Sequence, residues 1–387
     1  MKSGVYDYIA QDRVIFGVPA AQAVAEQAAA LKKSRLLVVA SKTLHRGTPA
    51  IREIVDALGD RCIGVYDECV EHVPRGAVLS LAKRIRDEQP DLIVTVGGGT
   101  PMDTVKVALV ALAENCHAEQ DFDRVRIQVD AAGKRIVPSV APPPVRQIIV
   151  PTTLSGGEFS MLAGATDPTR QVKDLYTGRY IGGQIVILDP SLTVHTPDRL
   201  WLSTGVRAID HAVETICSRT AQPLTDATSI HALRMLSQSL RTNRQVPTDL
   251  DARLASQQGV WLATMGIGRV EWGASHGIGH QLGAVANVPH GHCSCVLLPS
   301  VLRWNAETNA DRQHLIAEAL GSSDDAPDAV ATLIADLGQP TCLQDVGVRR
   351  DQFEAIARGA MQNMMVRSNP REIASVDDIL AILEMAW

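Results

Sequence analysis

The first half of the chain alternates short apolar runs with segments of helical periodicity. The apolar runs cover 35–40, 62–66 and 92–96, and the helical segments lie around 19–32, 48–58 and 75–88. Strands that are apolar along their whole length are buried on both faces, which is typical of a parallel sheet covered by helices. Such sheets bind ligands where the carboxyl ends of strands meet the starts of helices. We therefore predict an α/β domain in this half.

The second half reads as helices. Helical spacing extends over 198–219, 223–241, 249–268, 271–285, 292–305, 311–320, 326–337, 350–361 and 375–386. The last strand-like run, Ile185–Leu188, precedes an Asp-Pro pair that would end a strand. A chain of 387 residues is also long for one core. We predict an α/β domain over 1–192 and an all-α domain over 193–387.

A glycine triplet follows directly after the predicted strand at 92–96. Gly97, Gly98 and Gly99 lead through Thr100 into an apolar helix that we expect from Thr104, with Asp103 just before it. Glycines let the backbone approach a ligand closely, and a helix start offers unpaired N–H groups to a diphosphate. The alternative is a tight strand-to-helix turn without a ligand.

A second marked turn follows the predicted strand at 147–150. It contains Thr152, Thr153 and Ser155, the last next to a pair of glycines. Hydroxyl groups at such a turn can bind phosphate or ribose, or they can hydrogen-bond their own backbone. Between the two turns, the charged and proline-rich segment 117–147 is predicted to be a hairpin or a long surface loop.

Composition places the chain among globular proteins. Hydrophobic residues make up 45% and charged residues 21%, and the net charge is −6. This charge gives no global reason to expect nucleic acid or an anionic membrane as a partner. No run of eighteen apolar residues and no signal-peptide pattern occurs, so we expect a cytoplasmic protein with its seven cysteines reduced.

Histidines gather in the second half. His276 and His280 lie one helical turn apart, and His290 follows in a Pro-His-Gly-His segment, where we expect proline and glycine to break the helix. His211 could join them if its helix packs nearby. Such a group can bind a divalent metal or exchange protons with a reacting oxygen. Each histidine taken alone would more often be a core or surface residue.

These pieces together make the chain similar to the iron-containing (group III) alcohol dehydrogenase superfamily. The similarity rests on GGGTPMDTVK at 97–106, PTTLSGGE at 151–158, LDP at 188–190, GVRAIDHAVE at 205–214, HGIGHQLG at 276–283 and PHG at 289–291. It implies a Rossmann-like dinucleotide-binding domain and a helical domain, as in dehydroquinate synthase. It also implies hydride transfer between NAD or NADP and a small alcohol, aldehyde or keto compound, with both turns at the diphosphate, and a homodimer.

The resemblance also assigns a metal site, but with one departure. Metal-binding members use an aspartate four residues before a histidine and two further histidines, which correspond here to Arg207, His211, His276 and His290. Arginine has no lone pair and stays positively charged, so iron or zinc would be repelled at this position. Asp210 lies about 60° away from the direction of Arg207 on an ideal helix, which makes it a poor substitute.

This departure, with the short spacing of PTTLSGGE, resembles the maleylacetate reductases, whose catalysis is thought to need no metal. Asp103 instead resembles the alcohol dehydrogenases. Two further positions concern the cofactor. Lys173 lies where members place a lysine near the nicotinamide ribose, and Ser41 lies where NAD-preferring members carry an aspartate. Both NAD and NADP therefore stay open.

Four functions follow as alternatives. The favoured one is reduction of an anionic keto acid, with Arg207 binding its carboxylate and His211, His276, His280 and His290 serving as hydrogen-bond or proton donors. The second is a metal-dependent alcohol dehydrogenase that acts on a neutral alcohol. More distant are a lyase like dehydroquinate synthase and a nucleotide-binding protein without catalysis.

Overall fold

The computed structural model describes residues 4–130, 135–170 and 172–387. The chain divides into two compact units. The α/β unit comprises Tyr8–Thr153 and Gly157–Thr196. The helical unit comprises Pro197–Trp387 together with Leu154–Gly156 and the N-terminal segment through Asp7.

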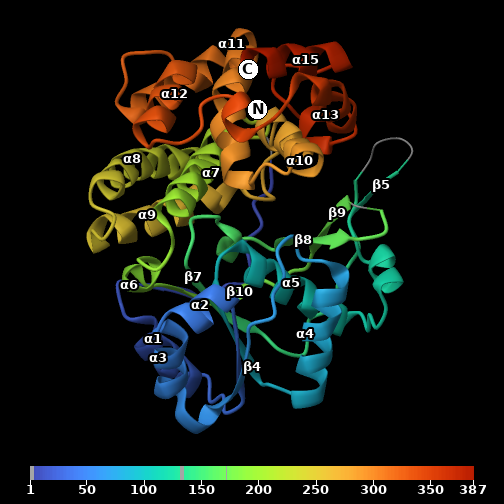
Figure 1. Ribbon diagram of the computed structural model, residues 1–387, viewed down its shortest axis with the longest axis vertical. Coiled ribbons are helices and arrows are strands. Elements are labelled where there is room, and N and C mark those ends of the chain that lie inside the picture. Colours follow the sequence, from blue (N-terminus) through green and yellow to red (C-terminus); the bar gives the residue numbers. More distant parts are fainter. Residues whose placement is uncertain (1–3, 131–134, 171) are drawn as a thin grey trace. The chain divides into compact units, whose positions relative to one another are not determined.

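A parallel sheet of six strands forms the centre of the α/β unit, as predicted (Figure 1). Its strands are β1 (Arg13–Phe16), β2 (Leu36–Ala40), β3 (Cys62–Tyr66), β4 (Leu92–Gly97), β7 (Gln147–Pro151) and β10 (Gly183–Leu188). They lie in the order β1-β10-β7-β4-β2-β3, and every neighbouring pair is parallel. Strands β2, β4 and β7 are buried along their whole length, which explains why they are apolar apart from Thr95 and Gln147, whose side chains hydrogen-bond to each other.

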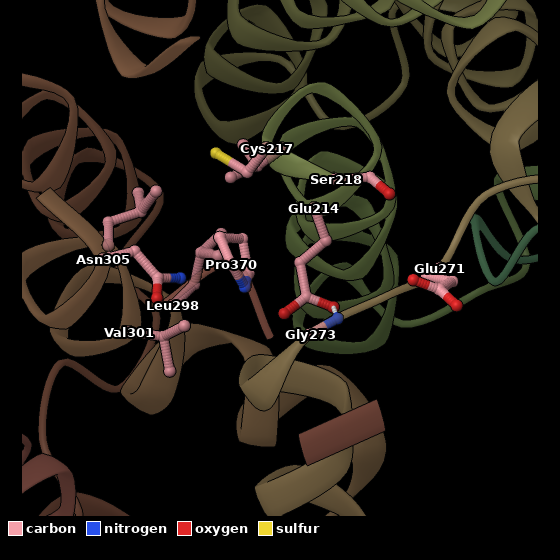
Figure 2. A pocket seen from close by; sticks show the side chains of 11 residues that line it. Glu214, Cys217, Ser218, Glu271, Gly273, Leu298, Val301, Asn305 and Pro370 are labelled. Atoms are coloured by element: carbon pink, nitrogen blue, oxygen red, sulfur yellow. Dashed lines mark hydrogen bonds between the residues drawn. The ribbon is translucent and has the colours of Figure 1, made fainter. Parts of the chain in front are cut away.

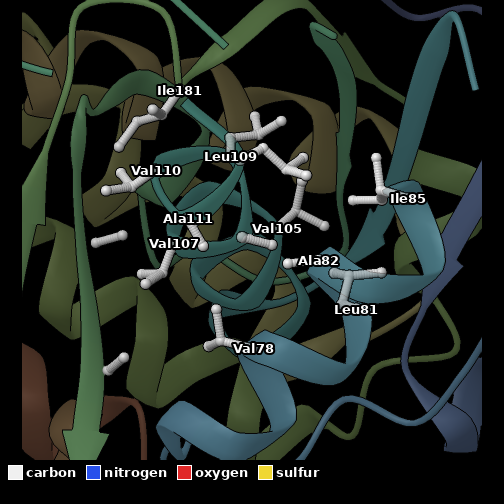
Figure 3. Packing of buried hydrophobic residues seen from close by; sticks show 14 of the residues in the cluster. Val78, Leu81, Ala82, Ile85, Val105, Val107, Leu109, Val110, Ala111 and Ile181 are labelled. Carbon is white, nitrogen blue, oxygen red and sulfur yellow. The ribbon is translucent and has the colours of Figure 1, made fainter. Parts of the chain in front are cut away.

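Helices cover both faces of this sheet. They are α1 (Ala20–Ala30), α2 (Lys42–Gly47), α3 (Ala50–Leu58), α4 (Arg75–Glu88), α5 (Gly99–Ala113) and α6 (Pro190–Thr193). One core joins α1, α2, α3 and α6 to the sheet, and the other joins α4 and α5 to it. Figure 3 shows the second core, where Val78 and Leu81 of α4 pack near Val105 of α5.

Two antiparallel hairpins extend the α/β unit. One pairs β8 (Leu162–Asp167) with β9 (Val172–Thr177), and the sequence did not predict it. The other pairs β5 (Gln128–Val129) with β6 (Arg135–Ile136), inside the segment 117–147 that was expected to form a hairpin or loop. Residues 131–134 of that segment lie outside the described residues.

Short 3-10 turns complete the chain. They are η1 (Gly59–Arg61), η2 (Glu119–Arg124), η3 (Gly157–Phe159), η4 (Thr264–Gly266), η5 (Gln344–Val346) and η6 (Arg350–Gln352).

The helical unit contains no strand among its described residues. Its helices are α7 (Asp198–Cys217), α8 (Pro223–Gln245), α9 (Leu250–Ala263), α10 (Ala274–Ala286), α11 (His290–Leu320), α12 (Ala326–Asp336), α13 (Phe353–Ala360), α14 (Met364–Arg367) and α15 (Val376–Met385). No helix in the part of the chain that the structure describes is long and apolar enough to span a membrane.

Three predicted helix boundaries were wrong. Helix α5 begins at Gly99 rather than Thr104, because Gly98 supplies its N-cap. The helices predicted at 292–305 and 311–320 are one element, α11, with a kink at Asn309. Gly291 does not break this helix but lies inside it. A Cβ atom there would lie 2.8 Å from the backbone of Ser203, so glycine permits the close packing of α11 on α7.

Candidate active site

Helix α7 carries four polar side chains on one face. Arg207, Asp210, His211 and Glu214 follow one another at spacings of one to four residues, which keep them on neighbouring turns. The last three are buried, whereas 13% of the Arg207 side chain is exposed. Asp210 follows Arg207 by three residues, and Nη1 of the long arginine side chain reaches to 3.5 Å from Asp210 Oδ2.

Asp210 is held by hydroxyl groups from two other helices. Its Oδ2 accepts hydrogen bonds from Ser275 Oγ of α10 at 2.9 Å and from Ser294 Oγ of α11 at 2.6 Å. Arg207 Nη1 in turn donates to Ser294 Oγ at 3.0 Å. Burial raises the pKa of Asp210, and the nearby His276 and Arg207 oppose that rise. The partly exposed arginine and the buried aspartate therefore form an ion pair that Ser294 links.

Glu214 contacts three nitrogen atoms at the start of α10, two of them backbone N–H donors. The backbone N–H of Gly273 donates to Oε2 at 3.0 Å, and that of Ser275 donates to Oε1 at 2.9 Å. His276 Nδ1 lies 2.7 Å from Oε2. Burial raises the pKa of Glu214 to about 7, although the backbone hydrogen bonds lower it. The sequence prediction missed Glu214, whose only signal was its position three residues after His211.

The His211 and His276 rings lie together against Trp272. The centroids of the two imidazoles are 5.1 Å apart, and that of Trp272 is 4.1 Å from His276 and 5.0 Å from His211. Neither His211 Nδ1 nor His276 Nε2 has a hydrogen-bond partner in the described chain. Burial, reinforced by neighbouring cations, lowers the pKa of both imidazoles well below the usual value, so both rings are neutral near pH 7.

His280 in the middle of α10 and His290 at the start of α11 lie near each other. Their ring centroids are 6.3 Å apart, and Asn363 Nδ2 lies 3.1 Å from His280 Nδ1. His290 is the exposed first residue of α11, whereas His280 is half-buried. Burial and the charge of Arg207 are the main causes that lower the pKa of His276, and His280 and His290 lower it further. Both histidines therefore lie within electrostatic range of His276. The helical unit thus gathers all four predicted histidines and Arg207.

These residues do not fit a divalent metal. The unpartnered ring nitrogens of His211 and His276 suit a ligand set, but Arg207 brings positive charge to the fourth position. Oxygen or nitrogen atoms of Asp210, Glu214 and His276 do lie within 4.8 Å of one another. Glu214 and Asp210 Oδ2, however, already accept hydrogen bonds from serine, backbone and imidazole groups. A metal would have to displace these donors beside a guanidinium.

A small cavity borders Glu214 on α7 (Figure 2). Its walls include Cys217, Gly273, Asn305 and Pro370. Its volume of about 10 Å³ is close to the minimum for one water molecule. The cavity is therefore too small to hold a substrate.

In the α/β unit, the two predicted turns lie in contact at the ends of β4 and β7. The backbone N–H of Thr152 donates to the Gly97 carbonyl at 3.0 Å. Gly97 has a φ of +147°, and a Cβ atom on it would lie 2.6 Å from Pro101. A Cβ atom on Gly98 would lie 2.9 Å from the methyl group of Thr153. Close packing therefore requires a glycine at both positions. Gly99 and Thr100 are the first two residues of α5.

Asp103 and Lys173 meet beside that turn. Asp103 Oδ2 accepts the backbone N–H of Gly164 at 3.2 Å and lies 3.6 Å from Lys173 Nζ. A Cβ atom on Gly164 would lie 2.2 Å from Lys173 Cε, so the lysine stem crosses β8 at this glycine. The unpredicted β8–β9 hairpin is thus what brings Lys173 to the glycine turn.

The last two predicted residues lie in different units. Ser41 follows β2 and caps α2, where its Oγ accepts the Leu44 N–H at 3.3 Å. Ser155 belongs to the segment Leu154–Gly156 of the helical unit. A Cβ atom on the neighbouring Gly156 would lie 3.5 Å from His211 Nδ1. Within the helical unit, Gly156 therefore lies next to His211.

A buried lysine also fixes the second turn, and the sequence prediction missed it. Lys106 of α5 is 0% exposed, and its Nζ donates to the carbonyls of Gly157 and Leu162. Burial lowers its pKa to about 8, while Asp103 and Glu158 raise it. Burial raises the pKa of Glu158 to about 7. The signal was a lysine within an otherwise apolar helix.

Two family models match the chain. The iron-containing alcohol dehydrogenase model matches residues 11–190, and the C-terminal model of the Fe-containing alcohol dehydrogenase family matches residues 201–387. Dehydrogenase FUM7 of Gibberella moniliformis (strain M3125 / FGSC 7600) is 33% identical over 408 residues, covering 96% of this chain and 95% of the relative. The chain belongs to the iron-containing alcohol dehydrogenase family.

Further relatives define its activity class and branch. Lactaldehyde reductase of Escherichia coli (strain K12) is 31% identical, with 96% of this chain and 97% of the relative covered. The crystal structure of maleylacetate reductase from Agrobacterium tumefaciens has a TM-score of 0.84 at 26% identity, covering 100% of this chain and 99% of that one. The predicted family and its maleylacetate reductase-like branch are confirmed. This family member is an NAD(P)-dependent oxidoreductase that acts on CH–OH groups.

Proposed function

We propose that this enzyme reduces the keto group of a small anionic keto acid with NADH or NADPH, without a resident divalent metal. Hydride adds to the carbonyl carbon, the oxygen takes up one proton, and the cofactor leaves oxidised. The observation that carries this proposal is the guanidinium of Arg207 at the fourth position of the family's metal site.

Arg207 has the contacts expected of a carboxylate-binding residue. Asp210 and Ser294 both engage the same nitrogen, Nη1, and so orient the guanidinium. Nε and Nη2 retain N–H donors, which match the two oxygens of a carboxylate. Because the side chain is 13% exposed, a substrate can reach it. The neighbouring histidines would then stabilise charge on the keto oxygen.

The cofactor position follows from the turns of the α/β unit. We propose that the diphosphate binds at Gly97, Gly98, Gly99 and Thr100, where the 15-residue helix α5 begins. Thr152, Thr153 and Ser155 would contact the diphosphate or ribose, and Asp103 and Lys173 would lie at the nicotinamide end. Ser41 places no negative charge at the end of β2, so the 2′-phosphate of NADP is tolerated.

One observation favours a second candidate, a metal-dependent alcohol dehydrogenase. His211 Nδ1 and His276 Nε2 have no hydrogen-bond partner in the described chain, and both rings are neutral, as metal ligands must be. In that case His211, His276 and His290 would hold iron or zinc, which would polarise the substrate oxygen as a Lewis acid. Arg207 would then have to move away from the ligands.

The two candidates differ in their response to EDTA and to Arg207→Ala. Oxidation of NADH and of NADPH is followed with a panel of keto acids and neutral aldehydes, each with and without EDTA. We expect keto acids to be reduced equally with EDTA. Arg207→Ala should raise KM for keto acids about 10- to 100-fold, as expected for loss of a charge-assisted contact, and leave neutral aldehydes nearly unchanged.

Arg199→Ala is the matched control, because Arg199 is an exposed arginine on the same helix. It should leave both substrate classes unchanged. Loss of all activity with EDTA, restored by added iron or zinc, would contradict the metal-free proposal. If Arg207→Ala lowers activity equally on keto acids and on neutral aldehydes, Arg207 does not bind the substrate carboxylate.

A further inference from the structure

We propose that Asn363 and Glu214 are positioning residues that fix opposite tautomers of the two histidines on α10. In this arrangement His280 presents an N–H at Nε2, and His276 presents a lone pair at Nε2. The inference rests on the proposed function, because it assigns His280 as the hydrogen-bond donor to the keto oxygen. Asn363 and Glu214 act only through the histidines.

The tautomer of His280 follows from the orientation of the Asn363 amide. Asn363 caps α14, and its Oδ1 accepts the backbone N–H of Met365 at 3.0 Å. This bond turns the amide nitrogen Nδ2 toward His280 Nδ1, 3.1 Å away. An amide NH₂ group can only donate, so Nδ1 must accept. A ring whose Nδ1 accepts a hydrogen bond carries its proton on Nε2, and this is the tautomer that the Asn363 contact assigns to His280.

The tautomer of His276 is the reverse. Glu214 lies 2.7 Å from His276 Nδ1, and its two oxygens also accept the backbone N–H groups of Gly273 and Ser275. In its ionised form Glu214 can only accept, and beside that form Nδ1 of His276 carries the proton. Nε2 is then an acceptor, and it has no partner in the described chain. The Trp272 ring, with its centroid 4.1 Å away, holds the imidazole plane in place.

These assignments give different roles to His276 and His280, which lie one helical turn apart on α10. During reduction, hydride transfer leaves negative charge on the keto oxygen, and an N–H donor aimed at that oxygen stabilises it. A neutral imidazole can serve as such a donor. His280 is half-buried and so can reach a substrate, whereas His276 is 0% exposed. The geometry thus favours His280 as the donor.

Asn363→Asp tests the assignment without removing the helix cap. One carboxylate oxygen can still accept the Met365 N–H, but the other replaces the amide donor with an acceptor next to His280 Nδ1. This change favours the opposite tautomer, with the proton on Nδ1. Asn363→Ala removes both contacts, so the amide no longer selects the tautomer of His280. A purely structural role predicts that Asn363→Ala is the more damaging change.

We expect the reverse ranking in kcat. Asn363→Asp should lower kcat for keto acid reduction about 10²- to 10⁴-fold with little change in KM, as expected when a catalytic imidazole has the wrong tautomer. Asn363→Ala should lower it less than about tenfold, although loss of the cap makes it the less stable variant. Equal rates for Asn363→Asp and the unsubstituted enzyme, or a larger loss for Asn363→Ala, would overturn the proposal.

Nitrogen NMR of histidine-labelled enzyme with bound NAD⁺ separates this inference from the proposed function. The spectrum should show His280 protonated at Nε2 and His276 protonated at Nδ1, and Asn363→Asp should move the His280 proton to Nδ1. If the tautomers agree but no keto acid is reduced, the proposed function fails and the assignment stands. If keto acids are reduced and His280 carries its proton on Nδ1, the assignment fails alone.

Discussion

Two buried charged sites, one in each unit, are stabilised in different ways. In the helical unit, Glu214 contacts three nitrogen atoms, and Asp210 Oδ2 receives two hydroxyl groups. In the α/β unit, the buried ammonium of Lys106 donates to two backbone carbonyls, while Oε2 of the buried Glu158 has no partner in the described chain. The first arrangement fixes the direction of side chains. The second holds two segments of backbone together through one compact charge.

This difference matches what each region has to do. Imidazole tautomers in the helical unit depend on directional donors and acceptors, so a saturated network of hydrogen bonds suits them. In the α/β unit, the backbone at Gly157 and Leu162 has to stay next to α5. The Lys106 ammonium holds it there through rotatable N–H donors, which do not require one fixed direction for each hydrogen bond. Removing the buried charge of Lys106 should therefore strongly lower the stability of the α/β unit. In the helical unit, the main effect should come from changing which groups donate and which accept hydrogen bonds.

Lys106→Met should have the largest effect on stability. Methionine fills a similar volume, but it leaves the carbonyls of Gly157 and Leu162 without their donor and Glu158 without a nearby cation. Removing one member of a buried charged group typically costs about 3–5 kcal/mol. The free energy of unfolding in urea measures this loss. Lys83→Met, at a lysine with 74% side-chain exposure, is the control and should cost less than about 1 kcal/mol. Similar losses for both variants would contradict the comparison.

Glu158→Gln should change how stability depends on pH. Burial raises the pKa of Glu158 to about 7 from an ordinary value of 4.5, so the folded protein holds its proton over a range in which the unfolded chain has lost it. This contribution to stability is complete below pH 4.5 and is lost as the pH rises through 7. The loss amounts to about 3 kcal/mol.

Glutamine does not titrate, so the decline between pH 4.5 and 7 should be smaller in the variant by the share of Glu158. Glu214, whose pKa burial also raises to about 7, keeps its own share. Urea unfolding at several pH values measures the decline. Above pH 8 both proteins should gain stability toward pH 10.5, because burial lowers the pKa of Lys106 to about 8. An unchanged decline between pH 4.5 and 7 in the variant would show that Glu158 is not its source.

Glu214→Gln should have the smallest effect on stability. The amide can accept two of the three N–H groups but presents its own NH₂ to the third, which costs about 1–3 kcal/mol locally. Hydrogen exchange of the Gly273 and Ser275 amides should become faster in the variant. Glu271→Gln is the control, since Glu271 borders the same small cavity from an exposed position. Unchanged exchange at both amides would contradict the saturated network.

Much of the fold could be predicted because burial leaves periodic patterns. Uninterrupted apolar runs marked five of the six sheet strands, and helical spacing marked α1, α3 and α4 closely. The β8–β9 hairpin was missed because LAGATD and VKDLYT contain polar residues and no sustained alternation. Its strands pair with each other, so their polar atoms are satisfied locally without an apolar sequence.

By itself, the sequence determined the family motifs, the two turns and the presence of Arg207 with its four histidines. Only the tertiary structure decided which partners these groups have. Glu214 contacts His276 across a separation of 62 residues in the chain, and Asn363 contacts His280 across 83 residues. A tautomer depends on the donor or acceptor that faces each ring nitrogen, and packing brings that group into place. Local periodicity carries no record of such a contact.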